Sequence, residues 1–409
     1  MMAENEFVLF ICGGKWQLPW FQYLKARGHL LALVDPYSTS PCVALADVFI
    51  QCDARDVEHI LIKVKELGLK ILFVTSDQTD VAALPVAEIS TSLGLISNPP
   101  DVVELFSNKY KNREFFRRFN LGHSPEFKQI SSASELVSFQ QHLGCKLIVK
   151  PVDAQSSRGI FIFDGTPDYS LEEKIREALK FSGKPYLIAE RFIEGFEITV
   201  EGFCNGNEHH VLAISDKKHF RTGIASELRY PARRISQIES ELIDFHNSLI
   251  RKMGLRFGIT HAEYLISPEG TDFWLVEVAC RGGGSLIPSH IVPWVSGFPV
   301  YDAYYDCLTK GGKSSLIYSI SEKKSAILYF FEFPNGKITG IKGQDLIENR
   351  HDVFSFGLEF KEGDVVKAAS DDRSRQGYVI VKADNDHTLK ASLEEIKNLL
   401  QVSIEGEVL

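Results

Sequence analysis

The chain has 409 residues, of which 44% are hydrophobic and 24% charged, as is ordinary for a globular protein. This length exceeds what one compact core usually holds, so two or three domains are expected. The net charge of −9 argues against a nucleic-acid-binding protein, because neutralising phosphates requires a basic surface.

The seven cysteines form no CxxC pair, which favours a reducing compartment over a disulfide framework or a zinc site. The first residues, "MMAENEFVLFICGG", lack the basic start and the long apolar run of a signal peptide. No run of 18 apolar residues occurs, so no transmembrane helix is expected. We therefore expect a cytoplasmic protein.

The first hundred residues alternate between short apolar runs and helical stretches. The runs are typical of parallel strands covered on both faces, and they are expected at residues 7–12, 30–35, 47–52 and 70–75. This βαβ alternation predicts a Rossmann-like domain over residues 1–100, built on an open and mostly parallel sheet.

The first strand-to-helix turn, "CGGKWQ", is rich in glycine, and Asp35 ends the second strand. A dinucleotide site has this general arrangement, so a dinucleotide-dependent oxidoreductase is one alternative. The turn lacks the full GxGxxG fingerprint, however, and a tight turn without a ligand explains it as well.

Two prolines, Pro99 and Pro100, indicate a domain boundary. The mixture of strands and helices that follows predicts a two-lobed α+β domain over residues 101–315, with a small lobe at about 123–190. Short strands, turns such as "PNGK" and a final helix predict a smaller C-terminal accessory domain over residues 316–409.

The segments "THAEYLI" and "DFWLVEVA" flank the turn-rich connector "SPEGT" and read as an antiparallel hairpin. If the hairpin is centred near Gly270, Glu263 faces Glu277. Facing like charges are unfavourable, and a hard divalent cation such as Mg²⁺ between the carboxylates would remove the conflict. Two solvated carboxylates on an exposed face are the alternative.

Arg281 and three glycines follow the second strand of this hairpin. The rigid fork of donors in arginine suits a carboxylate or a phosphate, and the glycines let the backbone approach a ligand closely. A salt bridge between Arg281 and a nearby acid is the alternative.

Two lysines, Lys109 and Lys150, are candidates for binding an anion. Lys150 ends a strand, and the following loop contains Ser156, Ser157 and Gly159, whose hydroxyl and backbone N–H groups could hold phosphate oxygens. An ordinary surface lysine is the alternative. Lys109 begins a helix, where a cation opposes the helix dipole, so an anionic partner is expected nearby.

The segment "YLIAERFIEGFEITVEGF" places several acids around an apolar connector between the two expected lobes. Such a connector suits a purine read by backbone groups, and Glu197 could accept hydrogen bonds from ribose hydroxyls. An amphipathic hairpin with solvated acids is the alternative.

The basic segment 215–235 is expected to reach the same site. It carries four arginines that suit an anionic substrate or, equally, a solvated loop: Arg221, Arg229, Arg233 and Arg234.

The order of these features, from Lys109 through Lys150 and "AERFIEGFE" to Glu263, Glu277 and Arg281, resembles the ATP-grasp superfamily of carboxylate–amine ligases. The resemblance covers roughly residues 5–310, and the "HAE…VEVACRGGG" segment looks most like the L-amino acid ligase branch.

The resemblance implies a role for each position. The residues implied to contact ATP are Lys109, Lys150, Ser156, Ser157, Gly159, Glu190, Arg191, Phe192, Ile193 and Glu197. Of these, the two lysines and the loop residues would contact phosphates, 190–193 adenine, and Glu197 ribose. Glu263 and Glu277 are implied to bind Mg²⁺ or Mn²⁺, and Arg281 to contact an acyl-phosphate or the substrate carboxylate. Ala279 stands where many relatives have asparagine, which leaves one or two ions open.

The implied reaction is phosphorylation of a substrate carboxylate by ATP, followed by displacement of phosphate by an amine. It forms an amide or peptide bond, with an amino acid as the expected substrate, and releases ADP and phosphate. The implied partners are small-molecule carboxylates and amines, and a homodimer is possible because dimers are common among such enzymes. A purine- or carbamoyl-type ligase using formate or bicarbonate, and a non-catalytic nucleotide sensor, are further alternatives.

Overall fold

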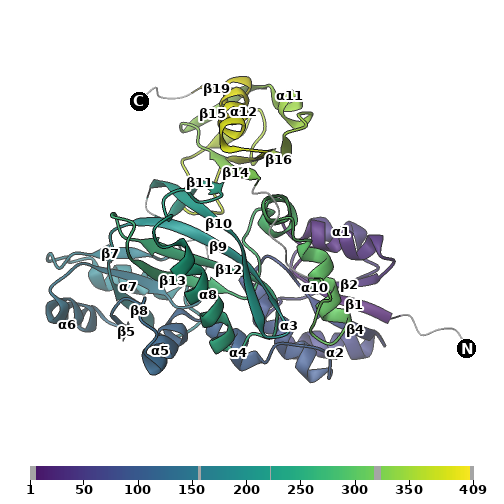
Figure 1. Ribbon diagram of the computed structural model, residues 1–409, viewed down its shortest axis with the longest axis horizontal. Helices are drawn as coiled ribbons and strands as arrows, with labels where there is room; N and C mark the ends of the chain where they lie inside the picture. The colour runs from purple at the N-terminus through teal and green to yellow at the C-terminus, as the bar shows by residue number, and fades with distance from the viewer. Residues whose placement is uncertain (1–5, 155–157, 222, 317–323, 406–409) are drawn as a thin grey trace, which may run out of the picture.

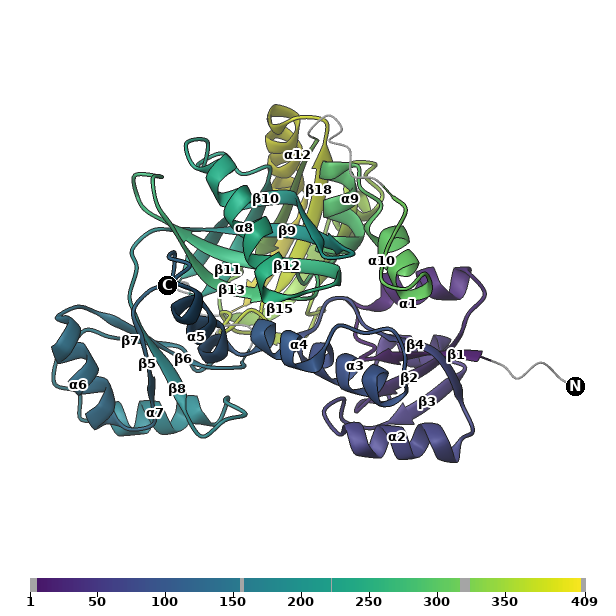
Figure 2. The same ribbon diagram turned by 60° about the horizontal axis from the view of Figure 1, so that its bottom comes forward.

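The computed structural model describes residues 6–154, 158–221, 223–316 and 324–405. Figures 1 and 2 show the N-terminal region at one side of a large central sheet, a small lobe at the other, and the C-terminal segment along the sheet's far edge. No helix in these ranges has the length and apolar character needed to cross a membrane. All seven cysteines lie in these ranges and are free thiols.

The N-terminal region forms a four-stranded parallel sheet of order β3-β2-β1-β4, which confirms the predicted open parallel arrangement. Its elements are β1 (Glu6–Ile11), α1 (Leu18–Ala26), β2 (Leu30–Asp35), the short helix η1 (Pro41–Leu45), β3 (Val48–Gln51), α2 (Val57–Glu66), β4 (Lys70–Thr75) and α3 (Asp80–Ser92). The strands are nearly all apolar because both faces of a parallel sheet are covered.

Asp35, at the end of β2, is hydrogen-bonded to the glycine turn that follows β1. Its carboxylate accepts hydrogen bonds from the N–H of Gly13 at 2.7 Å, the N–H of Tyr37 at 2.8 Å and the hydroxyl of Ser40 at 2.7 Å. These contacts within its own domain occupy both carboxylate oxygens, so the turn is explained by local packing and needs no ribose.

Two helices lead from this domain into a small lobe. The elements in order are α4 (Pro100–Ser107), α5 (Lys109–Phe119), β5 (Phe127–Ile130), α6 (Ala133–Leu143), β6 (Leu147–Pro151), β7 (Phe161–Phe163), α7 (Leu171–Leu179) and β8 (Leu187–Arg191). The strands form a sheet of order β5-β8-β6-β7, and its apolar side packs against α6 and α7.

The central sheet has eight strands in the order β13-β12-β9-β10-β11-β14-β18-β16. Its first part consists of β9 (Phe196–Asn205), β10 (Glu208–Arg221), β11 (Ile224–Tyr230), α8 (Glu239–Met253), β12 (Phe257–Ile266) and β13 (Phe273–Ala279). The helical segments η2 (Ile287–Ile291), α9 (Val292–Ser296) and α10 (Val300–Thr309) follow. Helix α8 covers one face through Leu242, Leu249 and Ile250.

The C-terminal segment is joined to this sheet by backbone hydrogen bonds. It contains β14 (Ser325–Phe331), β15 (Gly336–Lys342), α11 (Gln344–Glu348), β16 (Val353–Leu358), β17 (Val365–Val366), β18 (Gly377–Ala383), α12 (Asp386–Leu399) and β19 (Gln401–Glu405). Strand β14 pairs with β11 and carries β18 and β16 as a continuation of the central sheet. The remaining strands form a small sheet of order β17-β15-β19. C-terminal residues are thereby placed beside the cleft described next.

Candidate active site

A cleft of about 580 Å³ lies between the N-terminal domain, the two lobes and the C-terminal strands. It brings together residues from distant parts of the sequence. The predicted site residues that line it are Lys109, Lys150, Glu197, Glu263, Glu277 and Arg281.

The predicted pairing of the two carboxylates is confirmed: β12 and β13 are antiparallel, with Glu263 opposite Glu277. A lysine lies at each carboxylate. Lys217 Nζ is 2.8 Å from Glu263 Oε1, and Lys109 Nζ is 2.8 Å from Glu277 Oε2. In the free protein, these lysines relieve the repulsion between the facing acids.

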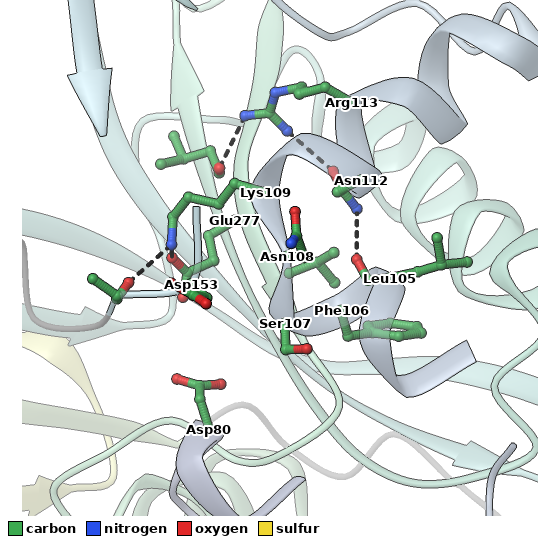
Figure 3. A pocket seen from close by; sticks show the side chains of 13 residues that line it. Asp80, Leu105, Phe106, Ser107, Asn108, Lys109, Asn112, Arg113, Asp153 and Glu277 are labelled. Carbon is green, nitrogen blue, oxygen red and sulfur yellow. Dashed lines mark hydrogen bonds and ion pairs between the residues drawn. The ribbon is translucent and has the colours of Figure 1, made fainter. Parts of the chain in front are cut away.

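Lys109 has the anionic partner that its position at the start of α5 suggests. Besides the ion pair with Glu277, its ammonium donates to the carbonyl of Ala154 at 3.0 Å, as Figure 3 shows. Burial alone would lower the pKa of Lys109, but the Glu277 carboxylate outweighs it and raises that pKa. The lysine is therefore charged and connects β13 to the start of the loop after β6.

Lys150 and Glu190 belong to a buried charge network that also contains Arg113 of α5. Glu190 accepts from Lys150 Nζ at 2.8 Å and from Arg113 Nε at 2.6 Å, and Glu190 and Arg113 are each 1% exposed. Burial opposes ionisation of Glu190, but the two cations hold its pKa at about 2. Arg113 also donates to the carbonyls of Leu275 and Val276 in β13. The side chain of Glu190 thus joins the small lobe to α5 and lies outside the cleft lining.

The other residues expected around adenine lie elsewhere. Arg191, Phe192 and Ile193 line a separate open hollow of about 430 Å³ together with Trp274. Gly159, with φ of 70°, has no room for a side chain, because a Cβ would lie 2.9 Å from Phe181. Ser156 and Ser157, predicted in the phosphate loop, lie outside the described residues.

Glu197 shares Lys217 with Glu263. Lys217 Nζ lies 2.9 Å from Glu197 Oε2, and His219 Nε2 lies 3.2 Å from the same oxygen. Burial opposes ionisation of Glu197, yet Lys217 and His219 lower its pKa to about 2. Burial alone would lower the pKa of Lys217, but the carboxylates of Glu197 and Glu263 outweigh burial and raise it.

The basic segment 215–235 thus reaches the cleft through Lys217 and His219, both of which contact Glu197 Oε2. Their spacing of two residues, the period of a strand, is the sequence signal that could have identified them. The four arginines of the segment do not line the cleft. Their partners are Glu332 for Arg221, Asp386 for Arg229 and Arg233, and the Phe196 ring for Arg234.

Arg281 is paired with an acid from another domain. Its guanidinium donates to the Asp80 carboxylate, and Nη2 also lies 3.8 Å from Glu277 Oε1. Burial alone would lower the pKa of Arg281, but Asp80 chiefly raises it. Gly282 and Gly283 are required by packing, since a Cβ would lie 2.6 Å from Pro288 or 2.8 Å from Ile287. Gly284 has open space and lines the cleft.

Two family models match the chain. The ATP-grasp domain matches residues 143–289, and L-amino acid ligase C-terminal domain 2 matches residues 329–405. Dapdiamide A synthase of Enterobacter agglomerans is 22% identical over 439 residues, which cover 98% of this chain and 97% of that protein. The carbamoyl phosphate synthase large chain of Methanothermobacter thermautotrophicus is 22% identical over 249 residues, or 59% of this chain, which spans only 22% of that relative.

Solved structures share the whole architecture. An L-amino acid ligase from Bacillus licheniformis has a TM-score of 0.80 at 18% identity, with 99% of this chain and 100% of that chain covered. Phosphoribosylglycinamide synthetase from Anaerococcus prevotii has a TM-score of 0.76 at 19% identity, covering 98% and 100%. At identities this low, the structural similarity establishes the two-lobed ATP-grasp fold alone. The two family models, one for the ATP-grasp domain and one for the L-amino acid ligase C-terminal domain 2, identify the chain as an ATP-grasp protein that most resembles the L-amino acid ligase branch.

Proposed function

We propose that this protein joins the carboxylate of one small molecule to the amine of another, with an amino acid as substrate, through an acyl-phosphate formed from ATP. The observation that carries the proposal is the presence of Lys109, Lys150, Glu263, Glu277 and Arg281 along one cleft. Phosphoryl transfer depends on positioning and on neutralising charge, and this set of residues supplies both.

The roles follow from charge and position. Lys109 and Lys150 bind the phosphates of ATP and neutralise charge on the group that is transferred. Arg281 holds the anionic acyl-phosphate while the amine attacks. The amine nitrogen bonds to the acyl carbon, the bond from that carbon to the phosphate oxygen breaks, and phosphate leaves.

The facing carboxylates fit Mg²⁺ or Mn²⁺, because these ions accept one or two carboxylates together with phosphate oxygens. Glu263 and Glu277 would hold the ion in place of their present contacts with Lys217 and Lys109. Ala279, which pairs with His261, offers no side-chain oxygen. The ion would supply further charge neutralisation to the transferred phosphoryl group.

Matches along the full chain support an amino acid substrate. The C-terminal match to L-amino acid ligases and the full-length likeness to dapdiamide A synthase both extend beyond the ATP-binding region. The cleft also has an apolar wall that includes Leu228, Leu328 and Phe330, which formate or bicarbonate would not need. The purine- or carbamoyl-type ligase is therefore the second candidate, supported by the partial match to carbamoyl phosphate synthase.

The test is phosphate release from ATP and Mg²⁺ with amino acids offered singly and in pairs, with products identified by mass spectrometry. Release that depends on a pair of amino acids, with a dipeptide as product, supports the proposal. Release with bicarbonate or formate alone would favour the second candidate. Nucleotide binding without release under any condition would indicate a sensor.

A further inference from the structure

The C-terminal segment contributes one arginine to the cleft in an unusual setting. Arg375 precedes β18, and its side chain is 16% exposed. Its guanidinium carbon lies 3.5 Å from the centre of the Phe330 ring, and both residues line the cleft. The arginine therefore packs against an aromatic ring inside the cleft.

The guanidinium has more donors than partners. It carries five N–H groups, and its one acidic contact within the described ranges is Asp372 Oδ1, at 3.1 Å. That oxygen also accepts the N–H of Ala225 at 3.0 Å. A largely buried cation is costly unless it is paired and hydrogen-bonded. Because Asp372 is its one ion-pair partner among the described residues, the other N–H groups of Arg375 can donate to a ligand.

The surroundings define that ligand. A planar fork of donors matches a carboxylate, and an apolar setting strengthens the pairing. The nearby wall is apolar, with Leu228 and Leu328 beside Phe330. Tyr378 and Trp16 form an edge-to-face pair with ring centres 5.1 Å apart on the same cleft, and the Lys15 ammonium, which pairs with Glu359, lies 4.2 Å from the centre of the Trp16 ring. A carboxylate attached to an apolar group fits this subsite.

Arg375 and the phosphate-binding residues lie on different walls of one cleft. Lys109, Lys150 and Glu277 come from α5 and the strands β6 and β13, whereas Arg375 comes from the C-terminal segment. The acid that is phosphorylated must lie beside the first group. The subsite at Arg375 is then available to the second substrate, which supplies the amine.

We propose that Arg375 binds the carboxylate of the amine-donating substrate, which is therefore an amino acid with an apolar side chain. This inference rests on the proposed ligase function. During the reaction, this carboxylate stays unchanged and becomes the C-terminus of the product, while the amine nitrogen forms the new bond and loses a proton.

The experiment compares an apolar amino acid with its carboxamide as amine donor, in the wild type and in Arg375→Met and Arg375→Lys. The methionine keeps contact with the Phe330 ring and removes the charge. We expect the kcat/KM for the amino acid to fall about 10- to 100-fold in Arg375→Met, since hydrogen bonds between charged groups have this magnitude. The carboxamide should be used as before, the KM for ATP should not change, and Arg375→Lys should recover part of the loss.

Arg234→Met is the matched control, because Arg234 also lies 3.5 Å over an aromatic ring, that of Phe196, but does not line the cleft. It should leave the preference for the amino acid unchanged. Equal losses with amino acid and carboxamide in Arg375→Met, or a change confined to the KM of the acyl donor, would overturn the subsite.

A binding measurement separates this inference from the proposed function. Calorimetric titration of the apolar amino acid should give binding to the wild type and not to Arg375→Met, whether or not turnover occurs. If the wild type binds the amino acid and its carboxamide equally well, the subsite is wrong. If the wild type binds the amino acid selectively but releases no phosphate with any pair, the ligase proposal fails and the subsite stands.

Discussion

Asp80 binds the guanidinium of Arg281 through two parallel hydrogen bonds, although the two residues are 201 positions apart in the sequence. Arg281 Nε lies 2.8 Å from Oδ1 and Nη2 lies 2.6 Å from Oδ2. Each side chain is 14% exposed. This bidentate geometry fixes the plane of the guanidinium as well as its position.

The turn before Asp80 also holds the glycine loop that follows Arg281. The carbonyl of Asp77 accepts the N–H of Gly282 at 2.7 Å, and Gln78 Oε1 accepts the N–H of Leu286 at 3.0 Å. Leu286 has φ of 67°, a left-handed conformation that a leucine adopts only when its surroundings impose it. The N-terminal domain thus shapes the part of the cleft assigned to the acyl-phosphate.

Asp80→Asn should therefore reduce kcat about 10- to 100-fold, because the amide keeps the shape but lacks the charge that orients Arg281. The KM for ATP should change little, since Asp80 is assigned to position Arg281 and not to bind nucleotide. Asp80→Glu should restore part of the rate. Steady-state kinetics with varied ATP checks this, with the exposed Asp101→Asn as control. An unchanged kcat would show that Arg281 needs no such positioning.

Glu277→Gln should reduce turnover by more than about 100-fold, because it removes one of two proposed metal ligands and the partner of Lys109. The unfolding midpoint should stay close to that of the wild type, since Glu277 is partly exposed in the cleft. Phosphate-release kinetics at several Mg²⁺ concentrations check the expectation. Glu269→Gln, in the exposed turn of the same hairpin, is the control. Full activity of Glu277→Gln would mean that the metal assignment is wrong.

Glu190→Gln should act on stability. The substitution leaves Arg113 and Lys150 without their buried counter-charge, and removing one partner of a buried ion pair costs about 3–5 kcal/mol. Urea unfolding at neutral pH measures the change. A loss below about 1 kcal/mol would show that the network is hydrated and contributes little.

The parts of the site that follow local sequence rules could be predicted. Glu263 and Glu277 belong to one hairpin, so the position of its turn determines which residues face each other. Lys109 could be expected to have an anionic neighbour because a helix start disfavours a cation. The parallel N-terminal sheet followed from its apolar runs.

Contacts that depend on how the domains pack could not be predicted in this way. Asp80 meets Arg281 only because two domains pack together, and Arg113 meets Glu190 only because α5 packs against the strands of the small lobe. No spacing rule links such residues. For the same reason, the addition of β14, β18 and β16 to the central sheet left no mark in the sequence pattern. Glu190 is expected beside adenine because it stands near the connector between the lobes. Nothing in the sequence indicates that Arg113 and Lys150 surround its side chain.

Stability should also depend on pH through His209, a residue of strand β10 in the central sheet that is only 3% exposed. Its ring nitrogens contact Asn247 Oδ1 at 2.8 Å and Thr260 Oγ1 at 2.7 Å. Burial is the main cause that lowers the pKa of His209 to about 4, although the contact with Asn247 opposes the shift. Below about pH 6.5, the unfolded chain binds a proton that the folded chain excludes, so the free energy of unfolding falls as the pH falls.

Between about pH 7 and pH 5, this histidine should cost the wild type about 2 kcal/mol of unfolding free energy. The lower end of this pH range, pH 5, lies above the range in which Glu190, with its pKa of about 2, becomes protonated and loses its contribution to stability. Urea unfolding of the wild type and His209→Gln at both ends of the window isolates the effect. The difference in stability between the two proteins should shift in favour of His209→Gln as the pH decreases, because glutamine does not titrate. A constant difference would mean that His209 becomes protonated in the folded protein as easily as in the unfolded chain.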